Sequence, residues 1–237
     1  GMDDICSFQR VANVINNACP DAVAIQELDS MTNRSGKTYV LGEIAERTQM
    51  HAYFAPAIDY DGGKYGIGLL TKQTPIRIQT MALPGREEAR ALIMAEFEDY
   101  IYCCTHLSLT EEDRMTSLEM IKNFAASAKK PFFLAGDMNA EPQSDFIKGL
   151  QKDFQILSNP KVPTFPAPKP EETLDYIVTL KNNAKGFAAI SSKVQDEPVA
   201  SDHRPLVVTL RTAEKAEKIF RTKPYLQNPV GNGITVM

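Results

Sequence analysis

Two hydrophobic patterns alternate along the chain. In the first, apolar residues recur every three or four positions, which is typical of a helix with one buried face. This pattern predicts helices over residues 8–18 and 39–50, a longer helix that starts after Thr110, and a short helix near 145–150. In the longer helix we expect the Thr110 hydroxyl to cap the first turn. Its buried face is predicted to consist of Met115, Leu118, Ile121 and Ala125.

The second pattern is a short apolar or alternating run bounded by turn residues, which is typical of a β-strand. It occurs at residues 22–25, 51–57, 65–72, 76–83, 91–98, 100–107, 131–137, 174–180, 186–191 and 204–211. Several of these runs follow one another with no helix between them, so antiparallel pairing is expected beside the parallel pairing of helix–strand units. The sequence therefore predicts an α/β fold with mixed sheets.

Composition limits what such a fold can do. The chain has 237 residues, of which 43% are hydrophobic, so it can bury a large core, and we expect one main domain. The formal net charge is −4, Trp is absent, and no run of Lys or Arg alternates with aromatic residues. This argues against a protein that holds long nucleic acid through its phosphates. No apolar stretch is long enough to span a bilayer, and no signal peptide precedes the first predicted helix.

The four cysteines show no metal-binding spacing. Cys103 and Cys104 are adjacent in a predicted strand, so their side chains are expected on opposite faces of a sheet. We interpret them as core residues, which leaves the redox compartment open.

Polar residues gather where predicted strands meet loops, the positions at which a rigid scaffold presents functional groups. They are Glu27, His106, Asp137, Asn139, Asp175, Asp202 and His203. Each has an ordinary structural explanation by itself: a turn former for Asp137, a left-handed residue for Asn139, a buried histidine for His106, and a simple loop for Asp202. Their recurrence at successive strand ends favours a functional site instead.

The stretch FFLAGDMN at residues 132–139 carries the clearest signal. An apolar strand ends abruptly in Gly136 and Asp137. In an extended segment residues two apart point the same way, so the Asp137 carboxylate and the Asn139 amide can share one target.

Six motifs in this order, IQELD, YGIGLLTK, THLS, AGDMNAEP, LDYIV and SDHRPL, resemble the endonuclease/exonuclease/phosphatase superfamily with the deoxyribonuclease I-like fold. The resemblance covers about residues 1–211. It implies a four-layer α/β sandwich, in which two mixed, largely antiparallel sheets are flanked by helices. It also implies hydrolysis of phosphate esters with a divalent cation, magnesium or, as an alternative, manganese.

Carried over by motif, Glu27 is the main metal ligand and Asp202 a second one, which suits the preference of Mg²⁺ for a few carboxylate oxygens. Asp137 orients or deprotonates the attacking water, and Asn139 donates to a phosphate oxygen or to that water. Asp175 orients His203, which is either a general base or a cation that stabilises the transition state. His106 supplies a second donor to the developing charge. For Gln26 and Tyr65, support of the metal or substrate and ordinary packing are weighed equally.

The chain departs from the family at its front. Members begin with a strand that ends in an Asn near the metal, whereas this sequence opens with GMDD, which resembles the loop after that strand. We therefore predict a domain over residues 1–212 that lacks its first strand. The C-terminal GITVM, with strand-forming Ile234, Thr235 and Val236, is the candidate to fill the gap, within its own molecule or across a dimer. The simpler alternative is a smaller sheet with a solvent-exposed edge and a mobile tail.

Residues 213–237 are predicted to be a connector and tail. The segment KPYLQNPVGNGITVM resembles the opening of the fibronectin-like domain that precedes purple-acid-type metallophosphatases, and a frayed tail is an equal alternative. If the resemblance holds, the protein has a second phosphoesterase module, and export to the periplasm or outside the cell is one alternative for its localisation. Localisation and oligomeric state otherwise stay open.

The predicted function is a metal-dependent phosphoesterase acting on a small phosphorylated molecule or a phospholipid head group. Arg34, Lys37, Arg86 and Arg90 are candidates to clamp the phosphate, or are simply solvated surface charges. A nuclease is the first alternative, although the acidic balance disfavours nucleic acid. A catalytically impaired binding module is the second.

Overall fold

The computed structural model describes residues 1–3, 5–183, 186–212 and 233–237. Within these ranges the chain forms two six-stranded sheets packed face to face. The first sheet has the order β10-β11-β12-β1-β3-β2, and the second has the order β4-β5-β6-β7-β9-β8.

The strands of the first sheet are β1 (Ala22–Ser30), β2 (His51–Tyr60), β3 (Gly63–Thr71), β10 (Phe187–Val194), β11 (Leu206–Thr212) and β12 (Gly233–Val236). Those of the second are β4 (Arg77–Leu83), β5 (Arg90–Glu96), β6 (Ile101–His106), β7 (Phe132–Asp137), β8 (Phe154–Ile156) and β9 (Asp175–Leu180). The helices are α1 (Phe8–Ala18), α2 (Val40–Thr48), α3 (Glu111–Ala126), α4 (Asp145–Asp153) and the short 3-10 helix η1 (Lys181–Asn183).

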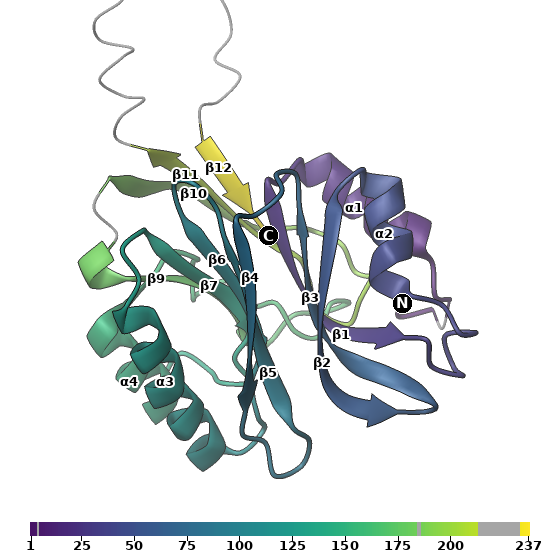
Figure 1. The fold of residues 1–237 in the computed structure, drawn as a ribbon, viewed down its shortest axis with the longest axis horizontal. Coiled ribbons are helices and arrows are strands. Elements are labelled where there is room, and N and C mark those ends of the chain that lie inside the picture. Colours follow the sequence, from purple (N-terminus) through teal and green to yellow (C-terminus); the bar gives the residue numbers. More distant parts are fainter. Residues whose placement is uncertain (4, 184–185, 213–232) are drawn as a thin grey trace, which may run out of the picture.

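Helices cover the outer face of each sheet, α1 and α2 on the first and α3 and α4 on the second (Figure 1). Three apolar clusters match these interfaces. One joins α1 and α2 to the first sheet through Ile15, Leu41 and Ile44, one joins α3 and α4 to the second sheet, and one fills the space between the sheets. The predicted four-layer α/β sandwich is confirmed. None of the described helices is long and apolar enough to cross a bilayer.

Strand β6 shows why adjacent apolar residues predicted a strand buried on both faces. Cys103 packs with the helix-facing cluster of the second sheet, while Cys104 packs in the cluster between the sheets. Both thiols are fully buried, as expected for adjacent residues in a strand with two covered faces.

Two expectations for α3 were wrong. Thr110 is the residue before the helix, but its side chain makes no capping hydrogen bond. Instead the Thr110 backbone N–H donates to Ser108 Oγ, and this hydrogen bond stabilises the turn just before the helix. Met115 is 36% exposed rather than buried, whereas Leu118, Ile121 and Ala125 are buried. At 100° per residue, Met115 lies at the edge of the buried face formed by Leu118, Ile121 and Ala125.

The C-terminal strand β12 lies between β11 and β1 in the first sheet. It runs antiparallel to β11 and parallel to β1. Met237 follows it, with its N–H donating to Ala22 O and its carbonyl accepting from Ala24 N–H and the Tyr102 hydroxyl. Val236 is fully buried. GITVM therefore forms a strand of the first sheet within its own molecule. The rest of the predicted connector, residues 213–232, lies outside the described residues, and the fibronectin-like resemblance stays a prediction.

Candidate active site

Three predicted site residues form one row across the second sheet. His106 ends β6 and is the register partner of Asp137, which ends the parallel neighbour β7. Asp137 in turn is the register partner of Asp175, which begins the antiparallel strand β9. Cross-strand partners have neighbouring side chains, so the sheet itself brings these polar groups together.

Gly136 explains the abrupt end of the apolar strand. A Cβ at this position would stand 2.0 Å from the Thr105 carbonyl oxygen, so no larger residue fits while β7 keeps this approach to β6. Its φ of 158° lies at the edge of the region that favours glycine. The glycine thus allows the close approach that sets Asp137 beside His106.

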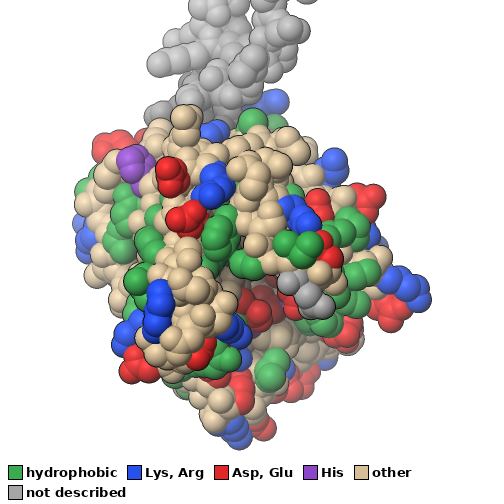
Figure 2. Space-filling view, turned by 90° about the vertical axis from the view of Figure 1, so that its right-hand side faces the viewer, with side chains coloured by type: hydrophobic (Ala, Val, Ile, Leu, Met, Phe, Trp, Pro, Cys, Tyr) green, Lys and Arg blue, Asp and Glu red, His purple; other side chains and the backbone are tan. Residues whose placement is uncertain are grey.

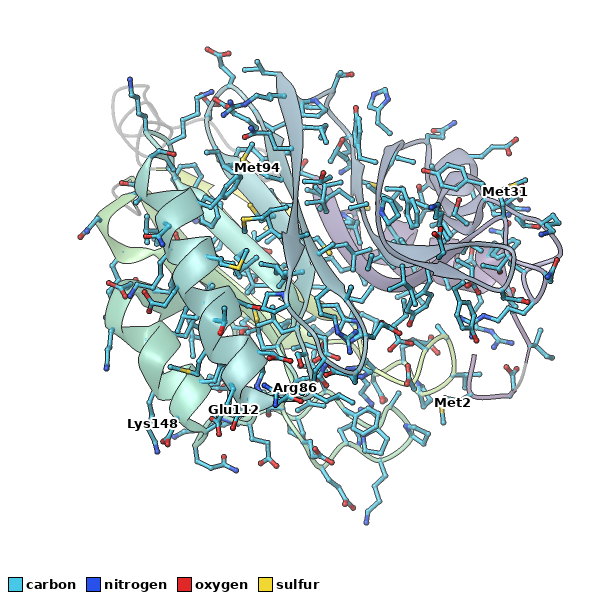
Figure 3. The ribbon with its side chains drawn as sticks, turned by 60° about the horizontal axis from the view of Figure 1, so that its bottom comes forward. Met2, Met31, Arg86, Met94, Glu112 and Lys148 are labelled. Atoms are coloured by element: carbon cyan, nitrogen blue, oxygen red, sulfur yellow. The ribbon has the colours of Figure 1, made fainter. Side chains whose placement is uncertain are left out.

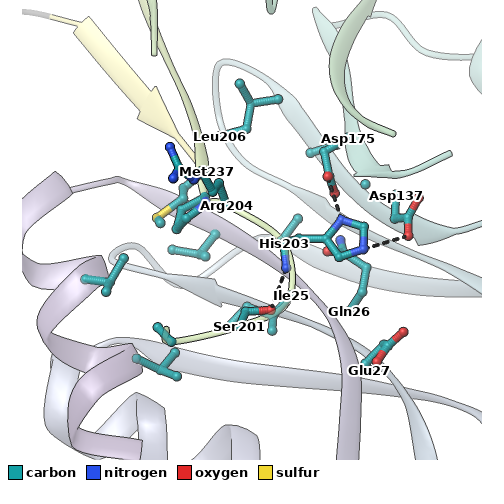
Figure 4. Close-up of a pocket in the computed structure, with 18 of the residues that line it drawn as sticks. Ile25, Gln26, Glu27, Asp137, Asp175, Ser201, His203, Arg204, Leu206 and Met237 are labelled. Carbon is teal, nitrogen blue, oxygen red and sulfur yellow. Dashed lines mark hydrogen bonds and ion pairs between the residues drawn. The ribbon is translucent and has the colours of Figure 1, made fainter. Parts of the chain in front are cut away.

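His203 connects the row to the first sheet, because it lies in the loop before β11. Its Nδ1 is 2.8 Å from Asp175 Oδ2, and its Nε2 is 3.8 Å from Asp137 Oδ2 (Figure 4). His106 Nε2 approaches the same Asp137 oxygen at 3.6 Å. Asp137 therefore lies between two imidazoles, and it is 6% exposed.

The two histidines have opposite electrostatic environments. Burial alone would lower the pKa of His203, but the hydrogen bond and charge of Asp175, with the charges of Asp137 and Asp202, outweigh it and raise this pKa to about 9. Burial, the positive charge of Arg90 and that of His203 lower the pKa of His106 to about 3. Near neutral pH, His203 is a cation and His106 is neutral. Burial raises the pKa of the Asp137 carboxyl, and the charge of Asp175 raises it further.

Glu27 does not lie at a strand end, contrary to the expectation. It is inside β1, at an irregularity where the pairing with β3 shifts between Ile25 and Leu28. Its φ of 58° is in the left-handed region, which is unusual for a non-glycine residue and is concentrated at functional sites. The bulge adds a residue to the strand and so redirects the Glu27 side chain, which is exposed to solvent.

The surroundings of Glu27 suit a bound cation. Although Glu27 is exposed, nearby protein atoms partly desolvate its carboxyl group and so raise its pKa, and the negative charge of Asp202 raises the pKa further. The described residues include no group of three or more His, Cys, Asp or Glu side chains arranged to hold a metal. Two neighbouring carboxylates that repel each other are still a fitting donor set for Mg²⁺, which takes one or two protein carboxylates and completes its shell with water and phosphate.

Asn139 is both a residue with left-handed backbone geometry and a side-chain donor close to the site. Its φ is 47°, so it is a left-handed residue, and its backbone N–H donates to Asp137 Oδ1. Its side-chain Nδ2 donates to the Leu107 carbonyl at 2.8 Å. Because an amide group carries two hydrogens, one is engaged by the backbone beside His106 and the other is left for a further acceptor.

A cavity of about 190 Å³ opens beside the cluster. Glu27, Asp137, Asp175, Asp202 and His203 line it, and its other wall is apolar, with Val11, Ile15 and Val23 among the lining residues. Gln26 also lines it, and its amide donates to Cys104 Sγ at 3.3 Å. Burial and the charge of Glu27 raise the pKa of the Tyr65 hydroxyl, which places Tyr65 beside that carboxylate.

Phe165 is a neighbour of the site that was not predicted from the sequence. Its ring centroid is 4.8 Å from that of His203. The Pro-rich segment that contains it is tied to the His203 loop by backbone bonds from Ala167 N–H to Asp202 O and from Arg204 N–H to Thr164 O. A run of prolines signals a loop, but which loop it contacts is not encoded in local pattern.

The four candidate phosphate clamps differ in their surroundings. On the surface, Arg34 pairs with Asp29, and Arg86 pairs with Asp113. Arg86 also lies near Glu112 at the start of α3, and Figure 3 labels both residues. Lys37 donates to Gly62 O. Arg90 is buried and lies against His106, with 3.4 Å between Nη1 and Nδ1. Lys, Arg, Asp and Glu side chains are interspersed over the face in Figure 2 and form no single basic patch there.

Two packed mixed sheets flanked by helices form the deoxyribonuclease I-like fold. The sequence model of the Endonuclease/Exonuclease/phosphatase family matches residues 4–203. The chain belongs to this family, whose members are metal-dependent phosphoesterases and nucleases.

Solved structures agree on the fold. An endonuclease/exonuclease/phosphatase from Beutenbergia cavernae superposes with a TM-score of 0.72 at 18% identity, covering 88% of this chain and 67% of that one. The human Nocturnin catalytic domain superposes with a TM-score of 0.64 at 19% sequence identity, and the match covers 86% of each chain. A mannosyl-6-phosphatase from Bacteroides thetaiotaomicron superposes with a TM-score of 0.66 at 13% sequence identity, and the match covers 86% of this chain and 90% of that one. No curated protein sequence matches the chain.

Proposed function

We propose that the protein is a divalent-metal-dependent phosphoesterase that hydrolyses a phosphodiester or phosphomonoester of a small molecule or lipid head group. The observation that supports this most is the placement of Asp137 between a cationic and a neutral imidazole, next to two carboxylates suited to a cation. Such a site combines a base, a positive charge and a neutral donor within a few ångströms.

The proposed roles follow from the charge of each group. Asp137 accepts a proton from the attacking water, because a raised carboxyl pKa makes it a better base near neutral pH. As the water oxygen bonds to phosphorus, the bond to the leaving oxygen breaks. His203, held as imidazolium by Asp175, stabilises the negative charge that develops and can return a proton to the leaving oxygen. This assignment favours the cation over the general base for His203.

The remaining residues hold and polarise the phosphate. His106 and the second amide hydrogen of Asn139 are proposed donors to its oxygens. Glu27 and Asp202 would hold Mg²⁺, or Mn²⁺ as an alternative, and the bound ion would act as a Lewis acid on the phosphoryl group. The apolar wall near Val11 and Ile15 suits a substrate with a nonpolar portion, and no basic track for a long polyanion is evident on the face in Figure 2.

One screen tests the proposal. The protein is incubated with bis(4-nitrophenyl) phosphate, 4-nitrophenyl phosphate, phospholipid vesicles and DNA, each with Mg²⁺ and with excess chelator. We expect hydrolysis of a small ester or lipid that stops with chelator. Cleavage restricted to DNA would identify a nuclease, and binding of phosphoesters without hydrolysis would identify an impaired binding module. The same screen of His203→Ala should show little hydrolysis. Its control is His51→Ala, because His51 lies in β2 and contacts Thr74 away from the cluster.

A further inference from the structure

The side chain behind His106 is a buried arginine that the proposed mechanism has not used. Arg90 begins β5 and is 7% exposed. The next residue, Ala91, is the register partner of His106, so Arg90 lies just past the end of β6. Its Nη1 is 3.4 Å from His106 Nδ1. A buried guanidinium is costly unless it is paired, which suggests that this placement has a use.

The contact with Arg90 determines the hydrogen positions on His106. A guanidinium has only donors, so in this contact Nδ1 of His106 must be the acceptor and cannot carry a proton. In a neutral imidazole the proton is then on Nε2. That nitrogen is the one directed at Asp137, with 3.6 Å between Nε2 and Oδ2. The ring therefore presents its N–H to the cluster rather than a lone pair.

Arg90 is itself held by the loop that precedes it. Its Nη2 is 3.2 Å from Glu87 Oε1 and its Nη1 is 3.1 Å from Glu88 Oε1. The Glu87 carboxylate also accepts hydrogen bonds from the Leu109 backbone N–H at 2.8 Å and the Ser108 hydroxyl at 2.9 Å. Those residues directly follow His106 and Leu107 in the chain. Arg90 and the end of β6 are thus fixed to each other through one carboxylate.

We propose that Arg90 is a positioning residue that keeps His106 neutral and in the Nε2–H tautomer, so that its hydrogen is aimed at the phosphoryl oxygens during hydrolysis. This assignment rests on the proposed function for its role in turnover, but not for the tautomer. Burial and the charge of Arg90 both lower the pKa of His106, which agrees with a neutral ring. A purely structural Arg90 would stabilise the fold without controlling which nitrogen is protonated.

The first test needs neither substrate nor variant at Arg90. Nitrogen-15 NMR of the side-chain imidazoles near pH 7, with His106 assigned by its loss in His106→Gln, reports the tautomer directly. We expect a protonated Nε2 and an unprotonated Nδ1. A ring protonated on Nδ1, or on both nitrogens, would overturn the proposal. Because no reaction is involved, this result is separate from success or failure of the phosphoesterase assignment.

The second test uses Arg90→Met and Arg90→Lys in the full chain, with Arg77→Met as the matched control. Arg77 is at the far end of the β4–β5 pair, where it pairs with Glu96 on the surface. In Arg90→Met we expect the His106 tautomers to mix and kcat to fall at least about twofold with KM little changed, since the Nε2–H of His106 donates mainly in the transition state. Arg90→Lys should recover part of both. Unchanged tautomer or unchanged kcat in a folded Arg90→Met protein would refute the assignment.

Discussion

Asp175 Oδ2 and His203 Nδ1 are 2.8 Å apart, which joins the first residue of β9 to the loop before β11. This contact is one of those that link the two sheets at the candidate active site. It also fixes the charge of the histidine, because burial alone would have made the ring neutral.

This contact predicts how stability depends on pH. The pKa of His203 is about 9 in the folded chain against an ordinary 6.5, so the folded state binds the proton more tightly. The stabilisation is complete below pH 6.5 and is lost as the pH rises through 9. In chelator, the free energy of unfolding from urea titrations should therefore fall over this range.

The matched variant is Asp175→Asn, which removes the charge but keeps the size of the side chain. Its free energy of unfolding should depend less on pH between 6.5 and 9 than that of the original chain. Equal slopes for the two proteins would mean that Asp175 does not hold the proton on His203.

Catalysis should depend strongly on the residues that transfer a proton or carry charge. Asp137→Asn and His203→Ala are each expected to lower turnover by at least about a hundredfold while circular dichroism shows an intact fold. His51→Ala should retain the original turnover. If either site variant hydrolyses the identified substrate at nearly the original rate, its proposed role is incorrect.

Metal dependence should respond to Glu27. Glu27→Gln removes a hard anionic ligand, so the Mg²⁺ concentration for half-maximal activity should rise at least about tenfold, with a smaller change in KM. Glu46→Gln, on the exposed side of α2, is the control. Superimposable Mg²⁺ titrations of Glu27→Gln and the original chain would rule out Glu27 as the main ligand.

The C-terminal strand should stabilise the domain. Truncation after Arg221 removes β12, exposes backbone groups of β1 and β11, and should lower the melting temperature and promote association. Val236→Ala should cost about 2 kcal/mol, since it removes two buried methyl groups and leaves a cavity. Thr235→Ala, at a partly exposed position, should cost less. A monomeric truncated protein with an unchanged melting temperature would show that β12 does not occupy this position in solution.

The sequence pattern predicted the positions of several candidate site residues, because these residues directly end or begin apolar strands. His106, Asp137 and Asp175 lie at strand ends that sheet pairing aligns, so the local pattern was sufficient for them. Glu27 differs because a bulge carries it inside β1, and a bulge depends on the pairing with β3 rather than on the sequence of β1.

Contacts between distant segments were not readable. Phe165 meets His203, and Arg90 is buried against His106, only because tertiary packing brings their loops together. Arg90 and the exposed Arg86 are four residues apart in the same charged stretch, yet one is inside the protein and the other on its surface. Residue type and spacing alone do not separate them. The same limit explains Met115, whose exposure depends on what covers the edge of α3.

The place of β12 has a consequence for the order of folding. Among the described strands of the first sheet, β12 is the one that connects β10–β11 to β1–β3–β2, and its Thr235 N–H donates to Asp21 across a sequence separation of 214 residues. Neighbouring pairs such as β2–β3 and β4–β5 close short loops and can form first, whereas the closure at β12 carries a larger entropy cost. We therefore expect β12 to join after the rate-limiting step. Substitutions such as Val236→Ala would then speed unfolding more than they slow folding.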